Sequence, residues 1–102
     1  MNSFTKIEQY AIIKILSCIM KADGIIDPKE EEFMNQTYND FAITVSDLEY
    51  ISSIDDIQAN SIVRSITNEK KKQTLSLLVG MAKADGFIHP KEKDIISQIL
   101  FA

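Results

Sequence analysis

A ten-residue motif occurs twice in the chain, and this repeat constrains the fold more than any other feature of the sequence. Residues 21–30 and 83–92 lie 62 positions apart and are identical at eight of their ten positions. The flanking positions agree in apolar character. The matching pairs are Ile15 and Leu16 with Leu77 and Leu78, and Phe33 and Met34 with Ile95 and Ile96. One helix-turn-helix unit is therefore encoded twice.

Glycine and proline mark the two ends of each turn. Gly24 and Gly86 suit the left-handed residue that ends a helix. Pro28 and Pro90 suit the first turn of the following helix, where a missing N–H group has no cost. The motif therefore predicts two short loops, each joining a pair of helices.

Each turn follows a long apolar segment. The first, residues 7–22, begins after the capping-box pair Thr5 and Glu8, and the second, residues 75–84, lies in a helix for which Asn68 is the expected cap. Helices with so few polar residues are expected to touch neighbours on most sides. We therefore expect these two segments to pack against each other in the middle of the molecule.

Weaker signals predict a short helix near 47–53, a longer one near 55–66, and an irregular connection over 39–45. The helix-start patterns are Ser46 with Glu49 and Ser53 with Asp56. Three glycines and two prolines leave little room for tight hairpin turns. The sequence predicts an all-α fold: a compact helical bundle of about six helices with two pseudo-symmetric helix-loop-helix repeats, forming a single domain over residues 1–102.

Composition narrows the class of protein. A net charge of −4 argues against a sequence-independent grip on nucleic acid. No uninterrupted apolar run is long enough to span a bilayer, and a single cysteine, Cys18, fits a reducing compartment. The three-lysine run at 70–72 is shorter than the clusters that bind lipid, so we interpret it as a solvated face and not a membrane surface. We expect a cytoplasmic protein that binds no nucleic acid.

The Asp-Gly loops are similar to part of a calcium loop, but a self-contained EF-hand is excluded. If Asp23 holds the fifth position of such a loop, Ile19 and Lys21 hold the first and third, and neither can ligate calcium. The second copy fails in the same way, with Met81 and Lys83 at these positions.

The acidic residues of the two copies can still meet. Glu30 and Glu92 precede apolar residues by three and four positions, so each is expected on the buried face of its helix, whereas Glu31 is expected in water. Asp23 and Asp85 lie at helix C-termini, where the helix dipole disfavours a carboxylate. A cation held between the copies would relieve both costs.

A purely structural interpretation explains the same residues. An aspartate before glycine commonly bonds its own loop, and Asp27 with Glu30 matches a capping box, for which His89 is a poorer cap in the second copy. From spacing alone, the metal and the capping interpretations both remain open.

The doubled motif Lys-Ala-Asp-Gly-x-Ile-x-Pro-x-Glu, in an all-helical chain of this length, resembles the tellurite-resistance TerB-like family over nearly the whole chain. The resemblance implies a helical bundle of two related halves with a divalent-metal site formed by the acidic loops. Carried over by position, the implied ligands are Asp23, Asp27, Glu30, Asp85 and Glu92. We expect a divalent cation, calcium or manganese, at this site. His89 departs from the pattern by replacing an oxygen ligand with nitrogen, which weakens the case for calcium and makes manganese or zinc conceivable.

We therefore expect a small non-enzymatic module that binds a divalent cation and engages protein partners, in a stress response as the resemblance implies. The alternative is a purely structural protein-interaction domain without metal. An enzyme is less favoured, because the chain has one histidine, His89, no Gly-rich phosphate loop and no nucleophile motif. Cys18 falls within an apolar helical pattern and is expected to be inert.

Overall fold

The computed structural model describes residues 4–21, 27–83, 93–94 and 97. The described segments 4–21 and 27–83 contain five α-helices: α1 (Lys6–Lys21), α2 (Pro28–Asp40), α3 (Val45–Ser53), α4 (Asp56–Arg64) and α5 (Asn68–Ala82). No strand occurs among the described residues, so the all-α prediction is confirmed for this part of the chain. The helix expected after the second motif falls largely outside the described residues, and the predicted pseudo-symmetry of the two copies remains a prediction.

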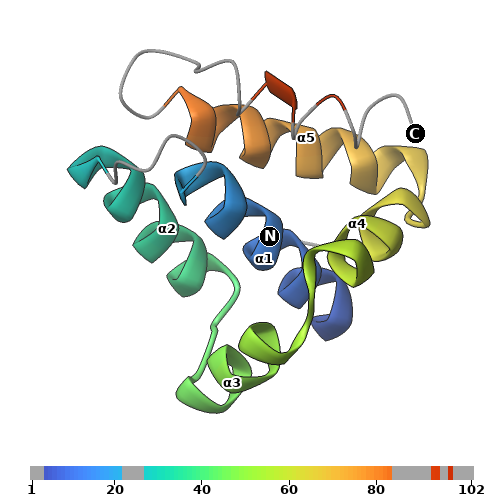
Figure 1. Ribbon diagram of the computed structural model, residues 1–102, viewed down its shortest axis with the longest axis horizontal. Coiled ribbons are helices and arrows are strands. Elements are labelled where there is room, and N and C mark those ends of the chain that lie inside the picture. Colours follow the sequence, from blue (N-terminus) through green and yellow to red (C-terminus); the bar gives the residue numbers. More distant parts are fainter. Residues whose placement is uncertain (1–3, 22–26, 84–92, 95–96, 98–102) are drawn as a thin grey trace.

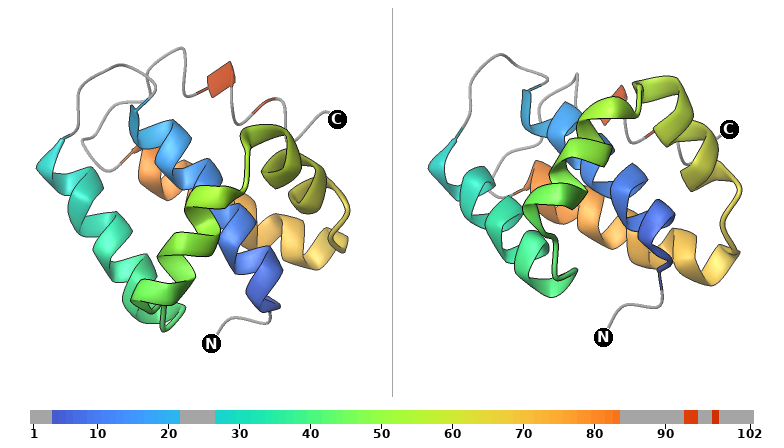
Figure 2. Two further views of the ribbon diagram at one scale, coloured as in Figure 1. Left: turned by 60° about the horizontal axis from the view of Figure 1, so that its bottom comes forward. Right: turned by 90° about the horizontal axis from the view of Figure 1, so that it is seen from below.

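Helix α1 is surrounded by the other four helices (Figure 1). Figure 2 shows α3 and α5 on opposite sides of α1, while α4 packs along it. Seven of its sixteen residues are buried: Gln9, Ala11, Ile12, Ile13, Ile15, Leu16 and Ile19. The expected central position of the first long segment, and its contact with the second, are confirmed, since α1 packs on α5.

Helix α5 closes the bundle by packing on α1, α2 and α4. It approaches α2 at Gly80, where an added Cβ atom would lie only 2.8 Å from the ring of Phe33. The glycine therefore lets an aromatic side chain of α2 rest directly against the backbone of α5. This contact joins the first half of α2 to the C-terminal part of α5.

The link between α2 and α3 is a helix-ending turn with an alanine in the left-handed region. The N–H of Ile43 donates to the carbonyl of Tyr38 at 2.9 Å, and that of Ala42 to Asn39 at 3.1 Å, which is the Schellman pattern. Ala42 has φ 54°, a conformation that glycine usually supplies. The Phe41 ring packs edge-on against Phe4, with ring centroids 5.9 Å apart, and so fastens the turn to the chain before α1.

Three helices begin at other residues than the sequence predicted. Thr44, and not Ser46, caps α3 through a capping box with Asp47. Asp55 caps α4 with Gln58, and Thr67 caps α5 in place of Asn68. The predicted Thr5–Glu8 box before α1 is confirmed by backbone-to-side-chain bonds of 2.8 and 3.2 Å.

The central position of α1 predicts a sharp contrast between two of its apolar residues. Leu16 is fully buried, and truncating it to alanine leaves a cavity, so Leu16→Ala should lower the free energy of unfolding by about 2–5 kcal/mol. Ile7 is 63% exposed, so Ile7→Ala should change it by no more than about 0.5 kcal/mol. Urea unfolding followed by circular dichroism measures both. Equal losses for the two variants would contradict the assigned packing.

Candidate functional site

The first Asp-Gly loop ends in a capping box at the start of α2. The Asp27 carboxylate accepts the Lys29 N–H at 2.8 Å, and the Glu30 carboxylate accepts the Asp27 N–H at 3.2 Å. Asp27 is half-buried, while Glu30 is only 2% exposed. The predicted inward position of Glu30 is therefore confirmed, and Glu31 is exposed as predicted.

Only two of the five predicted metal ligands can be described. Asp27 and Glu30 lie together at the N-terminus of α2. Asp23, Asp85 and Glu92 lie outside the described residues, as does His89. Among the residues that the structure describes, no group of three or more His, Cys, Asp and Glu side chains is arranged to hold a metal ion. The meeting of the two loops across a shared cation therefore stays a prediction.

A second buried carboxylate, Asp47, was not singled out by the sequence. It accepts the hydroxyl of Tyr10 at 2.5 Å, the ammonium of Lys6 at 3.4 Å and the backbone N–H of Thr44 at 2.9 Å. The Tyr10 ring also stacks on Tyr50, with ring centroids 6.0 Å apart. This group joins the start of α1 to α3, so its role is structural.

The bonds to Asp47 also fix its charge. The Tyr10 hydroxyl, followed by the Thr44 N–H, holds the pKa of the Asp47 carboxyl far below its usual range. The same bond raises the pKa of the Tyr10 phenol. Glu8, in the first turn of α1, behaves similarly, because the Lys70 ammonium, 2.8 Å away, lowers the pKa of its carboxyl. Lys70 is thus an ion-pair partner of α1 and not part of a fully solvated lysine face.

Cys18 is half-buried at the contact of α1 with α4, where its thiol donates to the Asp56 carboxylate at 3.3 Å. Burial, and then the bond to Asp56, raise the pKa of the thiol to about 11. A thiol that stays protonated near neutral pH is a poor nucleophile. This environment agrees with the expectation that Cys18 is inert.

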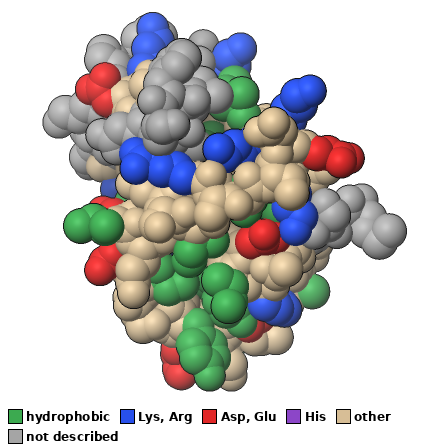
Figure 3. Space-filling view, turned by 90° about the vertical axis from the view of Figure 1, so that its right-hand side faces the viewer, with side chains coloured by type: hydrophobic (Ala, Val, Ile, Leu, Met, Phe, Trp, Pro, Cys, Tyr) green, Lys and Arg blue, Asp and Glu red, His purple; other side chains and the backbone are tan. Residues whose placement is uncertain are grey.

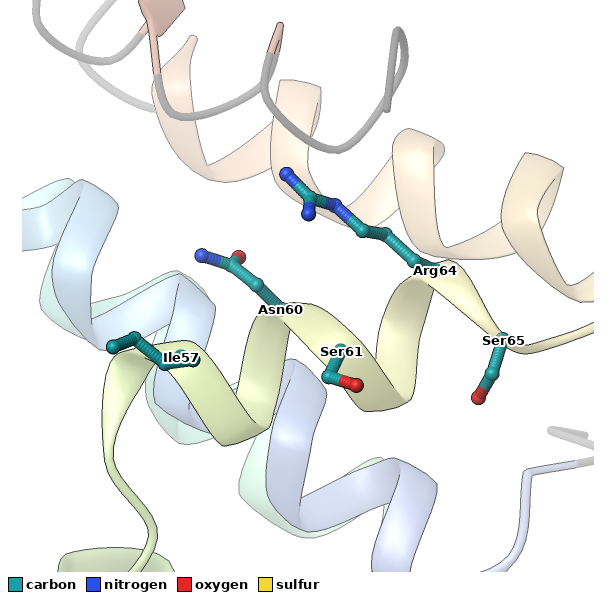
Figure 4. A pocket seen from close by; sticks show the side chains of 5 residues that line it. All are labelled: Ile57, Asn60, Ser61, Arg64 and Ser65. Atoms are coloured by element: carbon teal, nitrogen blue, oxygen red, sulfur yellow. The ribbon is translucent and has the colours of Figure 1, made fainter.

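The surface of α3 and α4 carries a series of hollows. On the side of the molecule shown in Figure 3, hydrophobic side chains gather on the lower part, at the height of α3 in Figure 1, and most Lys and Arg side chains lie higher. One hollow of about 410 Å³ lies along α3, and another of about 520 Å³ lies at the α3–α4 junction. A third, of about 440 Å³, follows α4, with Asn60 and Arg64 extending from the same side of the helix (Figure 4).

No helix in the described segments is both long and apolar enough to cross a membrane.

Comparison with known proteins supports the fold and leaves the function open. No family model matches the chain, and no curated protein matches it significantly. A crystal structure of a protein from Porphyromonas gingivalis is similar to it, with a TM-score of 0.76 and 28% sequence identity over 99% of this chain and 85% of that one. That protein is itself described as of unknown function.

Loss of the Asp47 charge should lower stability in a pH-dependent way. The folded-state pKa of this carboxyl lies below the unfolded value of about 3.9, so its stabilisation is complete above that pH and is lost as the pH falls toward the folded value. Asp47→Asn should therefore melt several degrees below the wild type near pH 7. The gap should narrow as the pH falls below about 4. A gap that widens in acid would contradict the assignment.

Cys18 should react slowly with alkylating reagents in the folded protein. A thiol pKa near 11 instead of 9.0 leaves about 100-fold less thiolate at mildly alkaline pH. Iodoacetamide labelling followed by mass spectrometry, in buffer and in denaturant, measures the difference. Asp56→Asn should speed the folded-state reaction because it removes the carboxylate that holds the proton. No acceleration would assign the slow reaction to burial of the thiol and not to the bond with Asp56.

Proposed function

We propose that this chain is a small non-enzymatic module, similar to the TerB-like proteins, that binds a divalent cation through its acidic Asp-Gly loops and engages protein partners in a stress response. The candidate ligands remain Asp23, Asp27, Glu30, Asp85 and Glu92, with calcium or manganese as the cation. The single observation that carries the proposal is the burial of the Glu30 carboxylate, which is 2% exposed at the end of the first loop.

Helix capping does not require this burial. In α4 of the same chain, Gln58 closes a capping box with Asp55, and both residues are exposed. Burying a carboxylate is costly unless its charge is well compensated. Carboxylate oxygens are the ligands that calcium and manganese prefer, and a cation beside Glu30 would add to the interactions that this carboxylate already makes. The repetition of the whole motif, with a second Glu at the matching position, supports a site formed by the two loops together.

The second candidate is a structural protein-interaction domain without metal, and a specific observation favours it. Both bonds of the capping box at Asp27 and Glu30 are formed, so these two residues already have a complete local role. In this alternative, Glu30 is buried because α2 enters the bundle at this point, and the Asp-Gly loops are only turns.

Amide variants separate the two candidates. Glutamine is an accepted partner in capping boxes and asparagine is a good N-cap, so Glu30→Gln and Asp27→Asn preserve capping. Both variants remove a charged ligand oxygen. Capping therefore predicts little change in either variant, whereas metal binding predicts loss of the response to cation.

In protein stripped with chelator, we expect calcium or manganese to raise the melting temperature. A cation at one hundred times its dissociation constant adds about 2.7 kcal/mol of stability, which corresponds to roughly ten degrees or more for a domain of this size. Glu30→Gln and Glu92→Gln should each remove most of that increment if one ion is shared. Calorimetry with and without added cation measures it.

Glu31→Gln is the matched control, because Glu31 is exposed one residue away and the charge change is identical. Its response to cation should equal that of the wild type. If no divalent cation shifts the melting temperature of the stripped wild-type protein, the metal proposal is wrong and the loops are turns.

A further inference from the structure

The charges of the chain are strongly segregated. Between Lys29 and Arg64 there is no lysine or arginine, although this stretch supplies most of α2 and nearly all of α3 and α4. It contains eight of the fifteen acidic residues: Glu30, Glu31, Glu32, Asp40, Asp47, Glu49, Asp55 and Asp56. All eleven basic residues lie before or after it. All of α3, and α2 and α4 apart from Lys29 and Arg64 at one end of each, are therefore without positive charge.

The exposed apolar residues concentrate on the same helices. Five large hydrophobic side chains are exposed in the described part of the chain, and four of them belong to α3 and α4: Val45, Leu48, Tyr50 and Ile57. Ile57 is 80% exposed and Tyr50 is 61% exposed. Two of the four, Tyr50 and Ile57, line adjoining hollows. Exposed apolar side chains rimmed by polar residues are typical of an interaction site.

Two of the hollows adjoin and combine these features. The hollow along α3 is lined by Ser46, Glu49, Tyr50 and Ser53. The junction hollow shares Ser53 and is lined in addition by Lys14, Ser52, Ile54, Asp55, Asp56 and Ile57. We call the two together the acidic groove. The hollow along α4 shares Ile57 with the junction hollow. Its charged lining residue, among those described, is Arg64, so this third hollow is not acidic (Figure 4).

The chemistry of the acidic groove selects its occupant. Anionic lipid surfaces and nucleic acids would be repelled by Glu49, Asp55 and Asp56. Lys14 also lines the groove, but the three carboxylates outnumber it. A basic protein segment is therefore attracted to the groove, and its apolar side chains match Tyr50, Ile54 and Ile57. The serines between them are small and allow close approach of a backbone. Helix α3 alone spans about 13 Å, so the groove can take two or more turns of helix.

We propose that the acidic groove docks a basic amphipathic helix of a partner protein. Apolar side chains on one stripe of that helix contact Tyr50 and Ile57, and flanking Lys or Arg residues pair with Glu49, Asp55 and Asp56. This inference deepens the partner half of the proposed function and rests on it. It involves no Asp-Gly loop residue, so it is tested independently of any cation.

The probe is a fluorescently labelled amphipathic peptide of leucine and lysine at helical spacing, titrated by anisotropy in chelator-containing buffer. We expect saturable one-to-one binding that weakens with added salt. A scrambled peptide of the same composition, and an analogue with glutamate in place of lysine, should each bind at least about tenfold more weakly, because the groove requires both the apolar stripe and the positive charge.

Matched variants locate the binding surface. Glu49→Gln with Asp55→Asn removes two groove charges, and asparagine preserves the α4 cap. The control is Glu31→Gln with Glu32→Gln, which makes the same change in net charge on exposed residues of α2. The groove pair should weaken binding about tenfold and the control pair less than about twofold.

A second pair of variants tests the apolar contacts of the groove. Ile57→Ser should weaken binding several-fold, whereas Ile7→Ser, at another strongly exposed isoleucine that does not line the groove, should leave it unchanged. Circular dichroism melts check that each variant stays folded.

Several results would overturn the proposal. Equal effects of the groove and control charge pairs would show non-specific attraction. Equal binding of the scrambled peptide would exclude an amphipathic helix. Sedimentation showing that the protein forms a dimer, with Ile57→Ser monomeric, would show instead that a second copy of this chain covers the groove. None of these results bears on the cation, because the titration contains chelator.

Discussion

Burial of α1 is the interaction on which the rest of the structure depends. Its side chains from Ile12 to Ile19 contact neighbours around most of the helix, and each of the other four helices packs against it. A helix with this much apolar surface is unstable in water by itself, and its stability comes from packing. The shorter helices α3 and α4, of nine residues each, likewise depend on α1 because helices of that length are marginal in isolation.

The spacing of apolar residues in the sequence predicted where the long helices lie. It did not predict which residues cap the shorter helices, because contacts between distant parts of the chain select them. Both Thr44 and Ser46 have an acidic residue three positions later, so local pattern alone permits either cap for α3. Thr44 is used because its partner Asp47 is also bonded by Tyr10, 37 positions away on α1. No local signal contains that contact. Similarly, Asp56 contacts Cys18 of α1 while its neighbour Asp55 serves as the cap of α4.

At the candidate site, too, the sequence predicted some features and not others. The inward position of Glu30 was predictable, because it follows from helical spacing to buried residues such as Met34. The capping box was predictable from the same ten residues. Residue spacing does not distinguish the metal interpretation from the capping interpretation. A buried carboxylate that caps a helix and one that ligates a cation occupy the same position. The difference lies in the free energy of binding an ion, which the sequence pattern does not contain.

The charge segregation adds a constraint on how the two halves of the proposed function relate. The stretch without lysine or arginine can be read from the sequence. Its consequence appears only in the fold, which brings exposed residues of α3 and α4 together on one surface. The acidic groove consists mainly of residues of α3 and α4. The first Asp-Gly motif leads into α2, and the second follows α5. Helices α2, α3, α4 and α5 all pack on α1, whose core-facing residues are buried. A cation at the loops would therefore add stability to the bundle that supports the groove without contributing a ligand to it. Cation binding would then change the affinity for the partner only if the cation altered the packing of α1. A groove on preformed helices binds its partner whether or not a cation occupies the loops.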